Sequence, residues 1–145
     1  MTIEFKMKNK TVFIASDHAG FRLKLQLLKI FPRIGDLGTN SDKSVDYPDF
    51  AHKLTNEVLK NKRNIGILIC GTGVGMSIAA NRKKGIRAGL ANSAKIARLI
   101  RKHNDANVLV LPGRFITINE AKKSVQAFLS TKFESGRHRK RINKI

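Results

Sequence analysis

The stretch Ile65-Gly66-Ile67-Leu68-Ile69-Cys70-Gly71-Thr72-Gly73-Val74-Gly75-Met76-Ser77 changes character at its centre. Its first five residues are apolar and mostly β-branched, which is typical of a short strand buried on both faces. Glycines then stand at every second position, and residues 76–82 have the composition of a helix. The stretch therefore predicts a strand, a glycine-rich turn and a helix, an arrangement that favours an anion at the helix N-terminus.

Apolar segments on either side of this stretch predict four further strands that alternate with helices. The expected strands are 10–16, 34–38, 65–69, 86–90 and 107–111, and the expected helices are 21–31, 47 to about 60, 76–82, 93–102 and 118–129. Strands that alternate with helices over short connections are typical of a parallel sheet with helices on both faces. The predicted fold is α/β, a Rossmann-like three-layer sandwich with a five-stranded parallel sheet.

Apolar residues at helical spacing predict which face of each helix points inward. These predicted inward faces are Phe21, Leu25 and Leu28 in 21–31, Ile96, Leu99 and Ile100 in 93–102, and Ala121, Val125, Phe128 and Leu129 in 118–129. Thr117 and Glu120 have the spacing of a capping box at the start of the last helix.

The net charge of +19 is the most unusual compositional feature of these 145 residues. It is compatible with a nucleic-acid or phosphorylated partner and equally with a solvated basic surface. Basic residues occur in most segments, which favours the second interpretation, and few aromatic side chains are present to stack bases. We therefore do not expect nucleic acid as a partner. The exception is the cluster 136–141, which either grips a phosphate or is disordered.

Cysteine content and hydropathy restrict the class of protein further. A single cysteine excludes an internal disulfide, and no His, Asp or Glu grouping has metal-ligand spacing along the chain. No apolar run approaches the roughly 20 residues that a membrane span needs, and the N-terminus lacks the apolar core of a secretory signal. We expect a cytoplasmic protein of one domain, with no membrane partner and no metal.

Residues that could bind a ligand or transfer protons lie at the ends of two of the predicted strands. In parallel α/β sheets, ligands bind beyond the carboxyl ends of the strands. Asp17 and His18 follow the first strand, and a carboxylate and an imidazole there can hold a sugar hydroxyl and a phosphate or move protons. Cys70 ends the central strand beside the glycine turn, where a helix N-terminus favours a thiolate base, and Thr72 can relay a proton. Each of these residues can also be a simple packing or turn residue.

His103 and Asn104 occupy a different position, at the end of the fourth predicted helix rather than the end of a strand. Within one chain they are expected to point away from Cys70. Spacing alone favours a helix C-cap for them. A symmetric dimer would bring them to a neighbouring chain's sheet edge.

Several short motifs occur together in one order between about residues 12 and 141. They are Ser16-Asp17-His18-Ala19-Gly20, Asp46-Tyr47-Pro48, Ile69-Cys70-Gly71-Thr72-Gly73-Val74-Gly75, Ala79-Ala80-Asn81-Arg82, Gly85-Ile86-Arg87-Ala88, His103-Asn104-Asp105-Ala106-Asn107-Val108-Leu109 and Gly136-Arg137-His138. This ordered set closely resembles the ribose/galactose isomerase family. The resemblance implies a Rossmann-like homodimer or dimer of dimers that interconverts ribose 5-phosphate and ribulose 5-phosphate without a metal or organic cofactor. It also makes residues 1–10 an N-terminal extension and 134–145 a basic C-terminal tail of a single sugar-phosphate isomerase domain.

The resemblance also assigns roles to individual residues. Cys70 corresponds to the base that moves a proton between C1 and C2, and no glutamate that replaces it in some members stands between residues 71 and 86. Thr72 corresponds to the proton relay between O1 and O2, and His103, assisted by Asp17, to the group that opens the sugar ring. In the family the site lies between two subunits. The implied substrate-binding residues are Tyr47, His18, Gly71, Gly73, Val74, Gly75, Asn104, Arg137 and Arg141.

The sequence leaves two related sugar phosphates as alternative substrates. Galactose 6-phosphate or allose 6-phosphate would need the same groups near C1 and C2, with a longer pocket. Galactose-type members divide these features between two different subunits. This chain carries Cys70, Arg137 and Arg141 together, which favours the pentose phosphate.

Overall fold

The central strand β3 (Asn64–Cys70) is buried over all but its first residue. In the computed structural model, which describes residues 9–145, it pairs in parallel with β1 (Thr11–Ser16) and β5 (Val108–Pro112). The two edge strands are β2 (Gly35–Asp36) beside β1 and β4 (Ala88–Leu90) beside β5, so the order is β2-β1-β3-β5-β4. The predicted five-stranded parallel sheet is confirmed.

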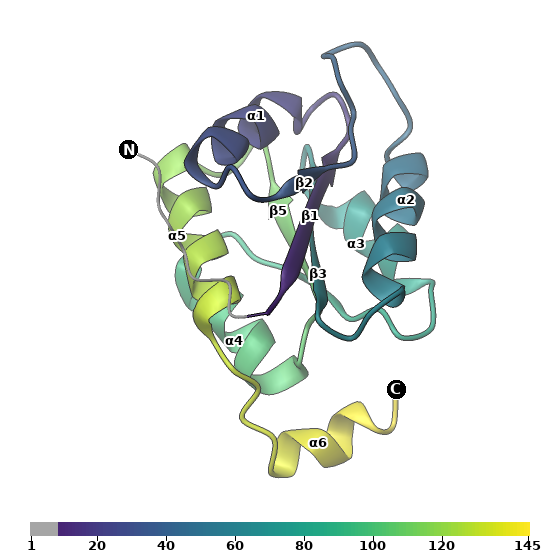
Figure 1. The fold of residues 1–145 in the computed structure, drawn as a ribbon, viewed down its shortest axis with the longest axis vertical. Coiled ribbons are helices and arrows are strands. Elements are labelled where there is room, and N and C mark those ends of the chain that lie inside the picture. Colours follow the sequence, from purple (N-terminus) through teal and green to yellow (C-terminus); the bar gives the residue numbers. More distant parts are fainter. Residues whose placement is uncertain (1–8) are drawn as a thin grey trace.

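Helices cover both faces of this sheet, as predicted (Figure 1). The helices α1 (Phe21–Ile30), α4 (Ala94–Asn104) and α5 (Ile118–Ser130) share one buried cluster with Ile65, Ile67 and Ile69. The helices α2 (Tyr47–Leu59) and α3 (Val74–Asn81) share the other with Leu68 and Cys70. Side chains along β3 therefore alternate between two cores, which explains why the whole segment is apolar.

A further helix, α6 (Arg137–Ile142), lies beyond the end of α4 at one end of the molecule (Figure 1). It contains most of the basic cluster 136–141, whose structure was left open between a phosphate-binding segment and a disordered one. Of the predicted N-terminal extension, residues 1–8 lie outside the described residues. No helix within 9–145 is both long and apolar enough to cross a membrane.

The predicted inward face is confirmed for α5, where Ala121, Val125 and Phe128 are fully buried. It is wrong in part for α1: Leu28 packs against the core, but Leu25 is 41% exposed, and Leu23, Lys24 and Leu27 are buried. The Lys24 ammonium lies 2.6 Å from Asp36 of β2, and this ion pair compensates the burial of the lysine.

The predicted face of α4 is also wrong in part, since Ile96 is 37% exposed while Ala97 and Arg101 are buried. Arg101 donates hydrogen bonds from Nη1 to Asp105 at 3.0 Å and to the Ala106 carbonyl at 2.6 Å. A guanidinium with partners of this kind can be buried at moderate cost. The apolar stripe of the helix consequently faces partly outward.

Local polar contacts join neighbouring elements. Thr117 Oγ1 accepts from the Glu120 amide at 3.1 Å, which is half of the predicted capping box. The Glu120 carboxylate instead accepts from the Ala94 amide at 2.7 Å, so it caps α4 from α5. On the sheet edge, the Asn81 side chain exchanges hydrogen bonds of 2.8 and 2.9 Å with the backbone of Ala88.

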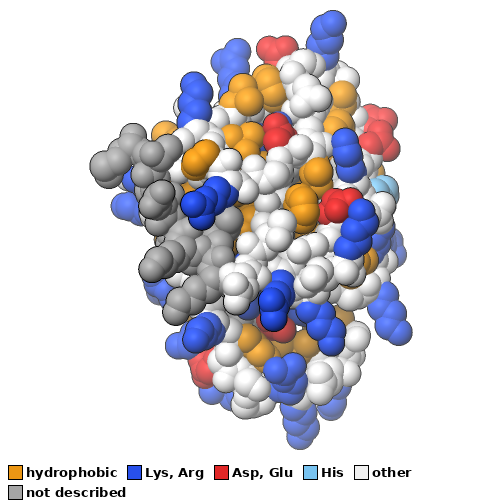
Figure 2. All heavy atoms as spheres, viewed as in Figure 1, with side chains coloured by type: hydrophobic (Ala, Val, Ile, Leu, Met, Phe, Trp, Pro, Cys, Tyr) orange, Lys and Arg blue, Asp and Glu red, His pale blue; other side chains and the backbone are white. Residues whose placement is uncertain are grey.

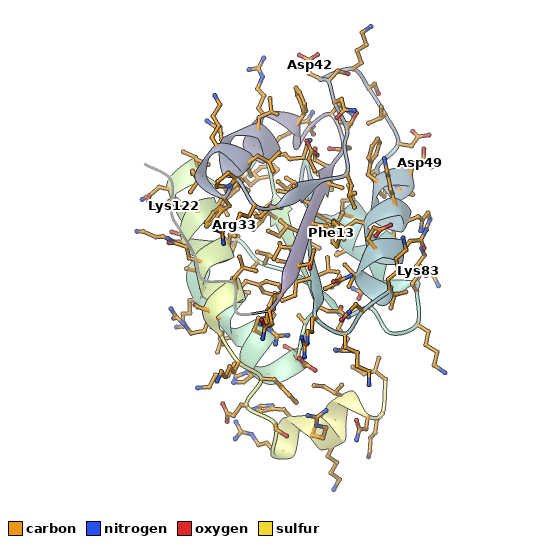
Figure 3. All side chains as sticks on the ribbon, viewed as in Figure 1. Phe13, Arg33, Asp42, Asp49, Lys83 and Lys122 are labelled. Carbon is orange, nitrogen blue, oxygen red and sulfur yellow. The ribbon has the colours of Figure 1, made fainter. Side chains whose placement is uncertain are left out.

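Lys and Arg side chains are scattered over the visible face, among Asp, Glu and hydrophobic side chains (Figure 2). Figure 3 shows the same distribution as sticks, with Lys122 on α5, Arg33 in the turn after α1, Lys83 in the turn after α3 and Asp42 in the loop before α2. This pattern agrees with the interpretation of the charge as a solvated surface rather than one binding patch.

Candidate active site

The carboxyl ends of β1, β3 and β5 meet at one edge of the sheet, where the turns that follow them bond to one another. The Asp17 amide donates to the Ile69 carbonyl at 3.2 Å. On the other side, the amides of Gly113 and Arg114 donate to the carbonyls of Cys70 and Gly71 at 2.8 and 3.0 Å. The structure therefore brings the predicted residues after β1 and β3 together, with the turn after β5 beside them. This edge is called the rim below.

Asp17 and His18 are fixed at the rim by backbone hydrogen bonds. Asp17 is 6% exposed, and its Oδ1 accepts from the Gly20 amide at 3.1 Å. His18 Nδ1 accepts from the Val45 amide at 3.2 Å. Because Nδ1 is the acceptor, a neutral His18 carries its proton on Nε2, where it can donate to an anion.

Cys70 is the last residue of β3 and is 4% exposed, at the base of the glycine turn. Gly73 has a φ of +78° as the N-cap of α3, a conformation that favours glycine. Within residues 9–145, the amides of Gly71, Gly73 and Gly75 donate to no other group. These amides and the positive end of α3 are thus available to an anion, and the anion site itself stays a prediction.

Thr72, Val74 and Tyr47 surround this turn. Thr72 Oγ1 accepts from the Val74 amide at 3.2 Å, and both side chains are exposed. The ring of Tyr47 lies only 2.6 to 2.9 Å from the position that a Cβ on Gly75 would occupy. Glycine at 75 therefore allows the tyrosine ring to pack against the turn, which places Tyr47 beside the predicted site.

Arg114 was not identified from the sequence. It follows β5, and its guanidinium lies 3.4 Å from the position of a Cβ on Gly71. A cationic side chain at that distance adds positive charge to the rim. Its only sequence signal is its place just after a buried strand, since the partner contact is set by the register of β3 and β5.

His103 and Asn104 lie at the opposite end of the sheet. They end α4, which starts after the carboxyl end of β4 and returns to the start of β5. The length of β3 separates this end from the rim, about 20 Å for a seven-residue strand. One chain therefore does not bring His103 to Cys70, as the sequence indicated.

The same end holds the predicted phosphate-binding residues of the tail. A cavity of about 280 Å³ is lined by His103, Asn104, His138, Arg141, Ile142 and Ile145. The rings of His103 and His138 are stacked, with centroids 4.4 Å apart and planes 17° apart. Arg137 precedes His138 as the first residue of α6, and its guanidinium is 3.9 Å from the Glu134 carboxylate. The predicted residues thus form two groups, one at each end of the sheet.

The described chain matches a protein-family model from residue 12 to residue 145, and that family is described as Ribose/Galactose Isomerase. The chain belongs to this family. The family predicted from the ordered motifs is confirmed.

Individual members of the ribose/galactose isomerase family are similar to the chain in sequence and in structure. The chain is 41% identical to ribose-5-phosphate isomerase B of Escherichia coli K12, over 94% of each chain. A crystal structure of a ribose 5-phosphate isomerase from Thermotoga maritima has a TM-score of 0.88 at 52% identity and covers 93% of this chain and 96% of its own. Ribose-5-phosphate isomerase B from Mycoplasma genitalium, solved with bound ribulose-5-phosphate, has a TM-score of 0.84 at 48% identity, over 92% of each chain. The chain is accordingly an isomerase of this family.

Two groups near His103 have shifted pKa values. Burial lowers the pKa of His138, and the positive charge of Arg137 lowers it further. A hydrogen bond from Lys102 lowers the pKa of Glu134. At neutral pH the imidazole of His138 is therefore uncharged and the carboxylate of Glu134 is ionised.

A cavity of about 750 Å³ belongs to neither group of predicted site residues. It lies at the amino end of the strands and is lined by basic side chains that include Lys62, Arg63, Arg87 and Arg139. None of the predicted site residues lines it.

Proposed function

We propose that the protein interconverts ribose 5-phosphate and ribulose 5-phosphate through an enediolate. The observation that carries the proposal is Cys70, the terminal residue of β3, beside the unbonded amides of the glycine turn. The names of the relatives support the same substrate pair, and the Mycoplasma genitalium protein was solved with ribulose-5-phosphate bound.

In this reaction the Cys70 thiolate removes the proton from C2 of the open-chain aldose and returns it to C1. Negative charge develops on O1 as the C2–H bond breaks. The amides of Gly71, Gly73 and Gly75 stabilise that charge, each by about 3–4 kcal/mol by analogy with oxyanion holes. Thr72 passes the O2 proton to O1, which completes the ketose. One base thus serves both carbons.

The phosphate provides binding energy away from the reacting carbons. His18 donates from Nε2 at the rim, because its Nδ1 already accepts from Val45. Arg137 and Arg141 suit phosphate because a guanidinium presents paired donors. Arg114, beside Gly71, joins this set as a cation at the rim. Ring opening falls to His103 with Asp17, and Asn104 holds a sugar hydroxyl.

This division of roles requires two chains, because His103 and Cys70 lie at opposite ends of one sheet. The edge formed by α3, β4 and α4 exposes the apolar side chains of Val74, Ile78, Leu90 and Ile96, which supports an interface there. An apolar cavity of about 420 Å³ adjoins it, lined in part by Ile86, Ile100 and Ile145. We propose a homodimer, alone or as half of a dimer of dimers, in which His103 of each chain serves Cys70 of the other.

The test is a complementation experiment with Cys70→Ser and His103→Gln. Each variant alone is expected to lose the conversion of ribose 5-phosphate, measured without added metal. After joint unfolding and refolding, half of the dimers are mixed and hold one intact site of two, so about a quarter of wild-type activity returns. A mixture that stays inactive, although both variants refold as dimers, would place the whole site in one chain.

Galactose 6-phosphate and allose 6-phosphate are assayed beside the pentose. Turnover of the pentose alone supports the substrate proposed here. Turnover of only a hexose phosphate keeps the mechanism at Cys70 and replaces the substrate.

A further inference from the structure

The cavity of about 750 Å³ at the amino ends of the strands has a cationic lining. Its wall comes from parts of the chain that are far apart in sequence, namely the residue before β1, the turn between α2 and β3, the segment before β4, and the helices α4 and α6. Among residues 9–145, six cationic side chains line it against the single carboxylate of Asp105, and the six are Lys10, Lys62, Arg63, Arg87, Arg101 and Arg139. This cavity is called the basic cavity below.

The carboxylate of Asp105 is already shared between two of these six cations. It lies 3.0 Å from the guanidinium of Arg101 and 3.3 Å from that of Arg87. Within the described part of the chain, the other four cations make no ion pair with a carboxylate. The basic cavity therefore has an excess of positive charge, which an anionic ligand would compensate.

Two of the lining cations show the cost of this excess. Burial lowers the pKa of Lys10, and the positive charge of Arg101 lowers it further, while Asp105 opposes this effect and Lys132 adds to it. Arg101 is 8% exposed, and its Nε is buried without a hydrogen-bond partner among residues 9–145. An anion in the cavity would attract both charges and so offset part of this cost.

The helix α6 forms part of the wall through Arg139, Ile142 and Asn143. The guanidinium of Arg139 lies over the ring of Phe133, 4.9 Å from its centroid. A cation–π contact at this distance restrains the side chain of Arg139. A ligand in the basic cavity would consequently contact α6 and the turn between α2 and β3 at the same time.

The lining also restricts the chemistry of the ligand. One phosphate group carries about −1.5 to −2 charges at pH 7, which compensates at most half of the four cations that lack a carboxylate partner. The guanidinium groups of Arg63 and Arg139 each present paired donors that match phosphate oxygens. No aromatic side chain of the described residues lines the cavity, so a nucleobase would find no ring to stack on.

We propose that the basic cavity is a second ligand site, which binds a small metabolite that carries two phosphate groups. Its volume is within the range of cavities that hold small molecules. None of the predicted site residues lines it, so the proposal does not depend on the proposed function. Because the ligand joins α6 to the turn between α2 and β3, its binding stabilises the fold against unfolding.

The direct test titrates the full-length protein with pyrophosphate in a calorimeter, at low ionic strength and without substrate. Saturable binding is expected, and its affinity falls at least about tenfold in Arg63→Gln and in Arg139→Gln. Arg63 is exposed in a turn, so its variant remains informative if Arg139→Gln disturbs α6. The control is Arg33→Gln, the same change at an exposed arginine outside the cavity, which keeps wild-type affinity (Figure 3). Equal affinity in all of these proteins, or no saturable binding, overturns the proposal.

Two other anions test the size and valence of the ligand. Inorganic phosphate is expected to bind at least about tenfold more weakly than pyrophosphate, because it reaches fewer of the cations. Equal affinities for the two anions would contradict a site for two phosphate groups. A short single-stranded RNA is the second probe. RNA that binds more tightly than pyrophosphate, and loses its affinity in Arg63→Gln, would overturn the assignment to a small metabolite.

A further measurement keeps this proposal distinct from the proposed function. Saturating pyrophosphate raises the thermal unfolding midpoint of the wild-type and Arg33→Gln proteins. Arg63→Gln loses this response and keeps the wild-type rate with ribose 5-phosphate. A response that persists in Arg63→Gln places the anion elsewhere, for example at the rim, and contradicts the basic cavity. Absence of isomerase activity from every protein, with the binding pattern intact, refutes the proposed function and leaves the second site in place.

Discussion

Arg101 donates to the Asp105 carboxylate at 3.0 Å, and His103 and Asn104 lie between these two residues in the chain. The same carboxylate accepts from Arg87 Nη2 at 3.3 Å, and Asp105 itself has a φ of +46° as the C-cap of α4. One aspartate thus terminates the helix and pairs with two guanidinium groups. This network fixes the last turn of α4, from which both candidate site residues project.

Asp105→Ala is expected to lower both stability and turnover. Loss of the two pairs and of a residue that tolerates a positive φ costs about 1–3 kcal/mol of unfolding free energy. His103 then loses its fixed position, so kcat for ribose 5-phosphate falls more than KM rises. Urea unfolding and steady-state kinetics measure the two effects. Asp42→Asn, in the loop before α2, serves as the control (Figure 3). An unchanged kcat in a destabilised Asp105→Ala protein would show that this network does not position His103 for catalysis.

Asp36→Asn is expected to destabilise the fold more than Lys24→Met does. The side chain of Lys24 is 0% exposed and pairs with Asp36 at 2.6 Å, while Asp36 is 34% exposed. Removal of the carboxylate leaves a buried ammonium unpaired and costs about 2–3 kcal/mol, after allowance for the exposure of Asp36. Replacement of the lysine by an apolar side chain of similar length costs less than about 1.5 kcal/mol. Equal losses in urea unfolding would show that the charge is not what matters.

Gly73→Ala is expected to disturb the glycine turn. The left-handed conformation at 73 costs alanine about 1–2 kcal/mol, and its Cβ would overlap the Leu90 side chain. Since the turn amides shift, the rate with ribose 5-phosphate falls at least about tenfold. Gly71→Ala has ordinary contacts around its Cβ and is expected to unfold near the wild-type midpoint. A stable and fully active Gly73→Ala protein would argue against the anion site.

Lys10→Met is expected to raise stability at neutral pH. Burial lowers the pKa of Lys10 from 10.5, and repulsion from Arg101 lowers it further, with Asp105 opposing and Lys132 adding to this repulsion. The unfolded chain therefore binds more protons between the lowered pKa and the ordinary one, and wild-type stability rises with pH across that window. The advantage of Lys10→Met should accordingly shrink as the pH rises. Thermal unfolding at several pH values checks this, with the exposed Lys123→Met as the control.

The order of elements was predictable because it depends on local patterns. A few adjacent residues are enough to predict the local structure at the apolar run 65–69, at the glycine turn and at the capping residue Thr117. The inward face of α1 was not predictable in this way. Leu23 and Leu27 have helical spacing as good as that of Phe21, Leu25 and Leu28. The partner that compensates the buried Lys24 is Asp36, which is distant in sequence.

In the candidate site, too, some residues were predictable from local patterns and others depend on tertiary contacts. Asp17 and His18 follow one buried strand and Cys70 ends another, so a parallel sheet places all three at one edge. The stacking of His103 on His138 depends instead on how α6 returns to α4, and no pattern in the basic segment encodes it. Arg114 was missed for a similar reason, because its neighbour Gly71 is reached only across paired strands.

The contact between Asn81 and Ala88 has a consequence for how the protein behaves at high concentration. β4 is an edge strand, and an open edge offers its amide and carbonyl groups to any other strand. The Asn81 side chain occupies both groups of Ala88, so the sheet is closed to further strands at that point without proline or a bulge. A single asparagine side chain thereby protects this edge from the strand addition that starts aggregation.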